Sequence, residues 1–342
     1  MTDSSIANET WDVLIIGSGH AGGMAAKILT ESGIRCLMLN AGPVADVTRD
    51  AENKHSYELP FRGFRPPGRV DHVFQANEHN ANVWVAEQEV PYTFEAEQPY
   101  NWVRVRLFGG RSLFWSRQSF RLSDYEFKAH SHDGFGEDWP ISHSDLAPYY
   151  ARVEGIFQVT GALDGPSQMP NGNFVIDSSP WCPAMQRFIA AGKSVGMPVC
   201  KQRTAVGRDG LASSVNLLLP DAERTGKLTS LANAVVREIT IDKYTGLPNG
   251  CHFVDRLSHR EMTVKARVVV LAAGTLESTR LLLNSNLANS SGLVGRYLMD
   301  QIYGAGVICS VPEARNGHSG EVMGSSAIVP RDRKSTRLNS SH

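Results

Sequence analysis

Hydrophobic residues along the chain form short continuous runs in some places and helical repeats in others. The first run, residues 13–16, leads through a Gly-x-Gly-x-x-Gly turn into a helical segment, residues 24–32, which should end at Gly33. A second apolar run, residues 36–39, follows directly. A buried strand, a helix and another buried strand within about thirty residues predict a β-α-β unit with parallel strands.

Hydrophobic positions recur with a helical period in three later segments, residues 142–157, 183–195 and 275–284. The first of these should begin at Ser142 or Ser144 and stop at Gly161, whereas residues 228–271 alternate in the manner of strands. The side chains expected to face inward from the three helices are Leu146, Tyr150, Val153, Phe157, Met185, Phe188, Ile189, Leu276, Leu282 and Leu283.

The Gly-x-Gly-x-x-Gly turn has the spacing that binds a dinucleotide. Gly17 permits the tight turn, Gly19 lets the backbone approach a pyrophosphate, and Gly22 lets the helix pack close to the strand. The N-terminal amides and dipole of the helix then face the negative charge, and the imidazole of His20 either meets a phosphate oxygen or points to solvent. The alternative is an ordinary α/β turn, but the order of strand, turn and helix favours the nucleotide.

Asn40 ends the second apolar run, where an acidic side chain commonly accepts hydrogen bonds from a ribose, about 20 residues past the glycines. An amide can also accept such a bond, but it carries no charge and the contact is weaker. Alternatively, Asn40 is only a turn residue before Gly42 and Pro43. Its position favours the ribose contact.

Two further segments with small residues could bring backbone to a cofactor. Gly109 and Gly110, followed by Arg111 and Ser112, either place amides against a phosphate or ring, or form a simple tight turn. The apolar strand at residues 267–271 ends in Ala272-Ala273-Gly274, where backbone can lie against a cofactor at the carboxyl edge of a parallel sheet.

Composition excludes several classes of function. The 342 residues are 42% hydrophobic and carry a net charge of −1, with no basic stripe for nucleic acid and no apolar run long enough to span a membrane. The polar N-terminus and five scattered cysteines without a C-x-x-C pair indicate a cytoplasmic protein with reduced, mostly buried thiols. His130 and His132 beside Asp133 form the best metal candidate, but a solvated loop is favoured and no metal is expected.

Taken together, these motifs resemble the glucose-methanol-choline (GMC) flavin oxidoreductases, most of all their bacterial sugar and polyol dehydrogenases. The resemblance covers nearly the whole chain to about Gly304. Beside the N-terminal glycine turn, it rests on residues 109–115, 138–154, 231–239, 272–285 and 294–300.

The resemblance implies an α/β fold with a Rossmann-like FAD-binding domain, containing a parallel sheet and a β-meander, and part of a second substrate or cap domain. The FAD-binding domain would comprise residues 1–60, 105–125 and 201–300. The partial cap domain would comprise residues 61–104, 126–200 and 301–330, leaving residues 331–342 as a tail of non-native appearance.

The resemblance also implies FAD rather than NAD, and an enzyme that oxidises the CH–OH group of an alcohol, a sugar or a polyol by hydride transfer to flavin N5. A separate, unidentified acceptor would reoxidise the flavin. Phe114 stands where relatives with covalent flavin carry a histidine, so FAD should be bound non-covalently. Val236 would pair its backbone with adenine, and Gly110 and Ser112 would lie beside the flavin. The cofactor-binding residues expected in this way are Gly17, Gly19, His20, Ala21, Gly22, Asn40, Gly110, Arg111, Ser112, Val236, Ala273 and Gly274.

The catalytic histidine of the family, with its His or Asn partner, is expected beyond the end of this chain. The segment from Lys334 resembles a translated library adapter, so we expect a truncated gene, and His342 is not a candidate base. Two functions remain open: a GMC-type dehydrogenase or oxidase whose N-terminal portion alone is inactive, or a flavin-binding fragment without turnover. An NAD-dependent reductase would leave the segments around Gly110 and Gly274 unexplained.

Overall fold

The computed structural model describes residues 6, 9–44, 54–68, 70–134, 136–177, 181, 183–208, 210–299 and 325–327. The chain divides into two compact units. The first comprises residues 1–115 with 213–299, and the second comprises residues 116–212 with 300–342. Residues 61–104 belong to the first unit by packing, whereas their expected place in a substrate domain is a statement about function and stays a prediction.

The first unit begins with the β-α-β unit that the sequence predicts. Strands β1 (Thr10–Ile16) and β2 (Cys36–Leu39) run parallel, joined by helix α2 (His20–Glu31). Every residue of β2 is buried, as expected for a strand covered on both faces. Helix α2 starts four residues earlier than the hydrophobic repeat indicated, because Gly22 and Gly23 are already part of its buried face. It ends before Gly33, whose φ of +82° suits glycine.

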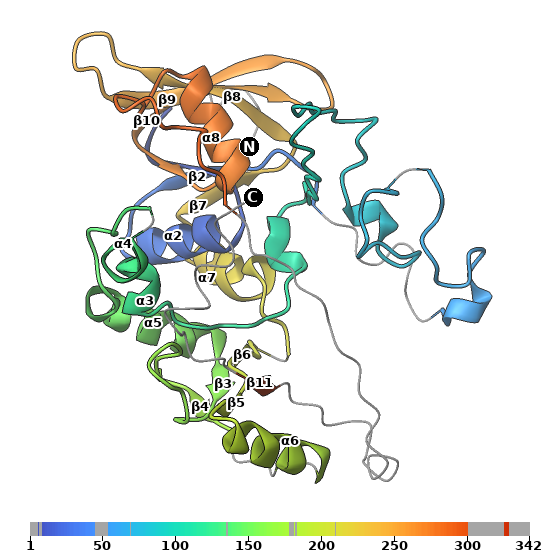
Figure 1. Ribbon diagram of the computed structural model, residues 1–342. Helices are drawn as coiled ribbons and strands as arrows, with labels where there is room; N and C mark the ends of the chain where they lie inside the picture. Colours follow the sequence, from blue (N-terminus) through green and yellow to red (C-terminus); the bar gives the residue numbers. More distant parts are fainter. Residues whose placement is uncertain are drawn as a thin grey trace. The chain divides into compact units, whose positions relative to one another are not determined.

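A six-stranded sheet forms the centre of this unit, with the strand order β7-β2-β1-β10-β9-β8 (Figure 1). Strands β7 (Leu228–Leu231) and β10 (Glu261–Leu271) are parallel to the N-terminal pair. Strands β8 (Ala234–Ile241) and β9 (Pro248–Asp255) continue as an antiparallel meander with β10. The expected combination of a parallel sheet with a β-meander is therefore confirmed.

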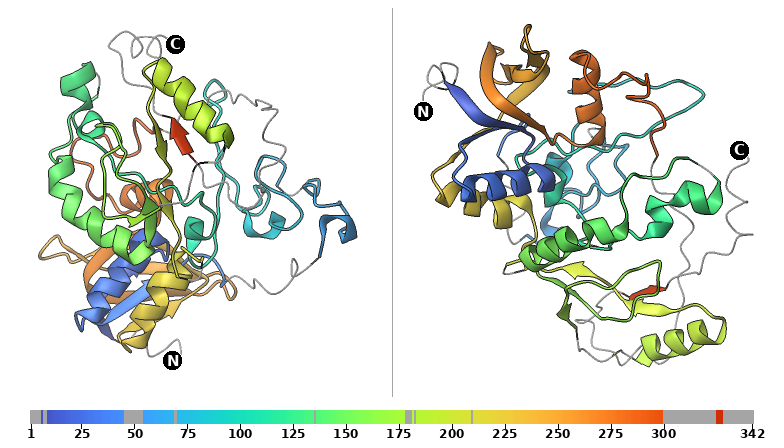
Figure 2. Two further views of the ribbon diagram at one scale, coloured as in Figure 1. Left: turned by 90° about the horizontal axis from the view of Figure 1, so that it is seen from below. Right: turned by 90° about the vertical axis from the view of Figure 1, so that its left-hand side faces the viewer.

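Successive residues of β1 and β2 pack on opposite faces of the sheet. Val13, Ile15 and Met38 contact α2 and α7 (Leu219–Arg224), which lie side by side in both views (Figures 1 and 2). The π-helical segment η4 (Ser214–Leu218) precedes α7. Leu14 and Leu37 face the other way, toward the meander and α8 (Thr275–Asn284). Because β1 pairs in parallel with both β2 and β10, with Ile16 opposite Leu39 and Leu271, the carboxyl ends of the three strands lie together at one edge.

The second half of β10 has a strand neighbour on one side. It pairs with β1 through residues 265–271, but its pairing with β9 covers residues 261–265. Among the residues that the structure describes, no strand pairs with the other edge of residues 266–271. Val268 is consequently 53% exposed, although it belongs to the apolar run of residues 268–271.

Residues 54–104 are irregular, with two short 3-10 segments, η1 (Ser56–Glu58) and η2 (Ala81–Val83). The segment folds back on itself through a bridge between Trp84 and Val105. A small apolar cluster holds it together, consisting of Val70, Val73, Ala76, Ala81 and Trp84.

The second unit contains a helical part and two small sheets. Its helices are α3 (Asp124–Phe127), α4 (Ala129–Asp133), α5 (His143–Phe157) and α6 (Pro183–Ser194). Its strands are β3 (Val159–Gly161), β4 (Val175–Ile176), β5 (Val199–Lys201), β6 (Thr204–Ala205) and β11 (Ser325–Ala327). The sheets have the orders β4-β3-β6 and β11-β5.

Helix α5 corrects two predictions. Ser142 caps its start through a reciprocal capping box with Asp145, but the helix stops at Phe157, since Gln158 turns left-handed, and not at Gly161. One predicted inward position also differs: Val153 is 39% exposed, whereas Glu154 is 4% exposed. Glu154 turns inward because its carboxylate receives two hydrogen bonds of 2.7 Å from the guanidinium of Arg121.

Two other predicted inward positions are also wrong. Phe188 of α6 is 46% exposed and Leu283 of α8 is 43% exposed, while the neighbouring Leu281 is fully buried. His130 and His132 lie in the short helix α4 and not in a loop. Within the described residues, no cluster of three or more potential metal ligands occurs. None of the described helices combines the length and hydrophobicity needed to cross a membrane.

Candidate cofactor site

Two glycines of the N-terminal turn are required by the packing of the protein against itself. Gly17 has a φ of +104°, and a Cβ atom there would lie 2.4 Å from the carbonyl oxygen of Ala272. A Cβ atom on Gly22 would lie 1.9 Å from the carbonyl oxygen of Gly17. These two positions therefore close the turn onto β10 and bring α2 onto the turn, as the motif predicts.

Gly19 is different, because a Cβ atom there would meet only one atom of the described residues beyond its chain neighbours, the carbonyl oxygen of Gly109 at 3.9 Å. Its φ of −67° is available to any residue. Gly19 precedes α2 and accepts the first helical hydrogen bond from Gly23 N–H, at 2.8 Å. The turn thus presents bare backbone beside a helix N-terminus, where His20, Ala21 and Gly22 supply the amides of the first turn. This open backbone is the geometry that a diphosphate needs.

A second glycine turn faces the first. Gly109 and Gly110 both have positive φ values, +96° and +53°, and lead into the 3-10 segment η3 (Gly110–Leu113). A Cβ atom on Gly110 would lie 3.8 Å from the Cα atom of Gly19. The two turns therefore approach each other backbone to backbone, although about ninety residues separate them in the chain.

Ser18 connects three segments through a buried chain of hydrogen bonds. Its Oγ accepts from Gly109 N–H at 2.7 Å and donates to Asn40 Oδ1 at 2.9 Å. Asn40 Nδ2 donates in turn to the carbonyl oxygen of Gly42 at 3.1 Å. Ser18 and Asn40 are 1% and 9% exposed. The candidate ribose residue is thus joined to both glycine turns.

Arg111 and Ser112, expected beside the flavin, are held by protein contacts. Ser112 is buried; its Oγ donates to the carbonyl oxygen of Gly109 at 2.6 Å and accepts from Ser214 N–H at 3.0 Å. Arg111 is exposed and donates to the carbonyl oxygen of Val103 at 3.0 Å. Both side chains therefore stabilise the second glycine turn.

The segment after β10 completes one edge of the site. Ala272 N–H donates to the carbonyl oxygen of Ile16 at 2.8 Å, which places Ala273 beside Gly17. Gly274 caps the start of α8 with a φ of +87°, and apart from its chain neighbours no atom of the described residues lies within 4 Å of a Cβ atom built there. Like Gly19, Gly274 presents open backbone at a helix start.

Val236, the candidate adenine residue, lies on β8 and is connected to this edge by an ionic chain. Its carbonyl oxygen accepts from Arg280 Nη2 at 3.1 Å, and Glu277 binds Arg280 at 2.8 Å and Arg106 at 2.9 Å. Burial alone raises the pKa of Glu277, but the hydrogen bond to Arg280 and the charges of both arginines outweigh it and hold the pKa below its usual value. A cofactor that used the Val236 carbonyl would share it with Arg280.

Two aromatic contacts involve the residues that follow the second glycine turn. The imidazole of His20 meets Trp115 edge to face, with ring centroids 4.7 Å apart. Phe114 packs on Trp84 at 5.3 Å. The first helical residue of the turn is thus anchored by the segment that follows η3.

Several residues of this site were not found from the sequence. They are Ser18, Arg106, Trp115, Glu277 and Arg280. The Gly-x-Gly motif leaves its middle position unspecified, so nothing in the local pattern marks Ser18. The ionic chain joins residues up to 171 positions apart.

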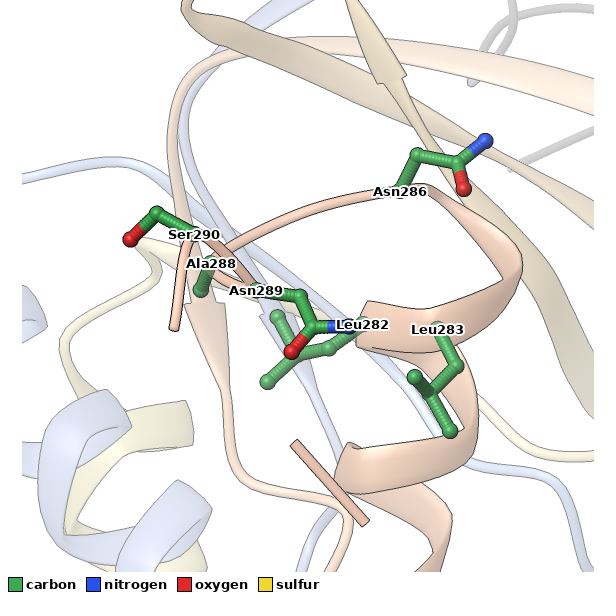
Figure 3. Close-up of a pocket in the computed structure, with 6 residues that line it drawn as sticks. All are labelled: Leu282, Leu283, Asn286, Ala288, Asn289 and Ser290. Carbon is green, nitrogen blue, oxygen red and sulfur yellow. The ribbon is translucent and has the colours of Figure 1, made fainter. Parts of the chain in front are cut away.

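A cavity of about 530 Å³ lies elsewhere, at the carboxyl end of α8 (Figure 3). Two leucines and small or amide side chains line it, none of them titratable. Because Gly274 lies at the opposite end of α8, this cavity is separate from the glycine turns. Its lining residues are Leu282, Leu283, Asn286, Ala288, Asn289 and Ser290.

Comparison with solved structures agrees with this geometry. Pyridoxine 4-oxidase from Mesorbium loti superposes with a TM-score of 0.52 and 22% identity, over 81% of this chain and 52% of that chain. An FAD-dependent oxidoreductase from Chaetomium thermophilum gives a TM-score of 0.53 with 16% identity, over 81% and 48%. At these identities the likeness establishes the fold.

Sequence comparison gives longer matches. The chain is 27% identical to the fructose dehydrogenase large subunit of Gluconobacter japonicus, over 86% of this chain and 59% of that protein. It is 26% identical to 2-methyl-1,2-propanediol dehydrogenase of Mycolicibacterium austroafricanum, over 85% and 55%. The chain therefore spans little more than half the length of these relatives. The family model described as GMC oxidoreductase matches residues 12–303, so the chain belongs to the GMC oxidoreductase family and carries its N-terminal, FAD-binding domain.

Proposed function

We propose that this chain is the FAD-binding portion of an enzyme that oxidises the CH–OH group of an alcohol, a sugar or a polyol, and that it holds FAD non-covalently. The observation that carries the proposal is the bare backbone of Gly19, which faces Gly110 at the N-terminus of α2. The protein itself does not need glycine at position 19, whereas a diphosphate lying against that backbone does.

Different residues of the first unit would bind different parts of the cofactor. Gly19 and the amides of the first turn of α2 would bind the diphosphate. The side-chain donor and acceptor of Asn40 that the protein leaves unused would hydrogen-bond to the adenosine ribose. Backbone at Gly110 and Gly274 would lie against the flavin end, and Val236 would offer its carbonyl to adenine beside Arg280. When bound, FAD supplies the hydride acceptor for the alcohol oxidation.

The position of Phe114 supports non-covalent binding. Its ring packs against Trp84, and a phenyl group offers no nucleophile for a bond to the flavin. The substrate class is supported by two of the relatives, a fructose dehydrogenase and a 2-methyl-1,2-propanediol dehydrogenase. We expect the catalytic histidine of the family to lie in the portion of the relatives that this chain does not cover, and the chain alone to bind FAD without turnover.

The test is retention of FAD by the purified full chain. We expect a saturable, stoichiometric flavin absorbance that survives gel filtration and is released completely by acid precipitation, with no oxidation of fructose or simple diols. Lack of flavin retention at saturating FAD would refute the proposal, and so would tighter binding of NADH or NADPH. Flavin that stays with the acid precipitate would refute the non-covalent part.

A further inference from the structure

The hydrogen bonds of Ser18 have a direction that the chemistry of the groups determines. Gly109 N–H can only donate, so Ser18 Oγ must accept from it and must send its own single proton elsewhere. The acceptor is Asn40 Oδ1, which requires Asn40 to turn its oxygen toward Ser18 and its NH₂ group toward the carbonyl oxygen of Gly42. The orientation of the amide therefore follows from the network.

This chain of bonds explains why position 40 carries a neutral amide where dinucleotide sites commonly carry an acid. Aspartate at position 40 would keep the bond from Ser18, but its second oxygen would face the carbonyl oxygen of Gly42 at about 3.1 Å, acceptor against acceptor. The site is 9% exposed, so water would not relieve the repulsion. Of the two residue types, only asparagine can both accept from Ser18 and donate to the carbonyl oxygen of Gly42.

The same bonds determine the distance between the two glycine turns. Gly19 follows Ser18 directly and Gly110 follows Gly109 directly, so the 2.7 Å bond from Gly109 to Ser18 joins the turns at their closest approach. Catalytic and binding sites lose much of their effect when such elements shift by about 1 Å. A small polar side chain at the middle position of the motif thus controls the space between them.

We propose that Ser18 and Asn40 are positioning residues for the dinucleotide, and that a neutral amide at position 40 is a condition of binding in this chain. This inference rests on the proposed function, since the ligand being positioned is FAD. Asn40 retains one N–H and one oxygen lone pair after its two protein bonds, so it can still meet a ribose hydroxyl. Its main role is to hold Ser18, and with it the N-terminal glycine turn, in place.

The experiment compares Ser18→Ala and Asn40→Asp with the unaltered chain and with Ser32→Ala. Ser32 is a matched control, because its exposed hydroxyl makes one hydrogen bond of 2.9 Å to Ile28 at the far end of α2. Three quantities are measured in the full chain: the Kd for FAD from quenching of flavin fluorescence, the visible circular dichroism of flavin at saturation, and the thermal midpoint without FAD. Binding is measured well below every midpoint.

We expect Ser18→Ala and Asn40→Asp each to weaken FAD binding about tenfold or more and to alter the dichroism of bound flavin. The double variant should lose little beyond the larger single effect, since both substitutions break one network. Ser32→Ala should leave the Kd and the dichroism unchanged. Should Ser18→Ala fail to fold, Ser18→Cys keeps the volume with a weaker donor and supplies the same comparison.

A purely structural role would lower the thermal midpoint and leave the Kd and flavin dichroism as in the unaltered chain, which would overturn the inference. Normal FAD affinity in Asn40→Asp would overturn the requirement for a neutral amide. If the unaltered chain binds no FAD, the proposed function itself fails and this inference fails with it. Failure of the inference alone is recognised by normal FAD binding in both the unaltered chain and Ser18→Ala.

Discussion

A methyl group added at Gly19 and at Gly22 should have opposite consequences, although both positions belong to the same motif. At Gly22 the new Cβ atom would lie 1.9 Å from the carbonyl oxygen of Gly17, so backbone must move by more than 1 Å. Overpacking of this kind costs about 3 kcal/mol or more, a large part of a typical domain stability of about 5–15 kcal/mol. We expect Gly22→Ala to fold poorly.

At Gly19 the same methyl group meets one protein atom, at 3.9 Å. Alanine is a poorer helix cap than glycine by up to about 1 kcal/mol, but it also restricts the unfolded chain by about 0.4–1 kcal/mol, so the two effects nearly cancel. The methyl group would, however, occupy the space where the diphosphate approaches. A loss of about 2 kcal/mol of binding energy would weaken FAD affinity by about thirtyfold.

The assay is thermal unfolding of each variant with and without FAD, together with a fluorescence titration of FAD. Gly19→Ala should keep the midpoint of the unaltered chain in the absence of FAD and lose most of the upward shift that FAD produces. Gly22→Ala should show a lowered midpoint before any FAD is added. Unchanged FAD affinity in Gly19→Ala, or full stability in Gly22→Ala, would refute the reasoning from backbone contacts.

Two further predictions concern stability. Glu154→Gln should lower the free energy of unfolding by about 3 kcal/mol in urea titrations, because it leaves the buried guanidinium of Arg121 without its counter-charge. The control is Glu261→Gln at an exposed ion pair, which should lower the free energy of unfolding by less than about 1 kcal/mol. Equal losses in the two variants would contradict the argument. Burial raises the pKa of Cys251 to about 12, so the folded protein favours the neutral thiol. Its contribution to stability should be complete below the usual thiol pKa of about 8.5 and should decline as the pH rises toward 12. The comparison is the unfolding free energy of Cys251→Ala, and parallel pH curves for the two proteins would count against this effect.

The N-terminal β-α-β unit could be predicted because its signals are local. Strand β2 occupies residues 36–39 as its apolar run predicts, and the left-handed Gly33 lies just beyond α2. The presence of strands within residues 228–271 follows from their period of two. In these segments, one or both faces of each helix or strand are buried against neighbouring elements, and the apolar positions in the sequence coincide with the buried faces.

The buried face of a helix was predicted less well where a polar side chain forms an ion pair with a residue distant in the sequence. Glu154 is buried and Val153 exposed because Arg121, 33 residues earlier, neutralises the carboxylate. A hydrophobic repeat assigns glutamate to solvent and valine to the core. The pairing that reverses this order is invisible until both segments are folded.

The sequence by itself determined where a dinucleotide could bind, since the order of strand, glycine turn and helix depends on neighbours along the chain. The tertiary structure alone decided what each residue of the turn does. Gly17 and Gly22 are closed by the protein's own backbone, Gly19 is open, and Ser18 joins segments 22 and 91 residues away. Contact distances and hydrogen-bond partners of this kind come from atoms remote in sequence, so the spacing of a motif cannot encode them.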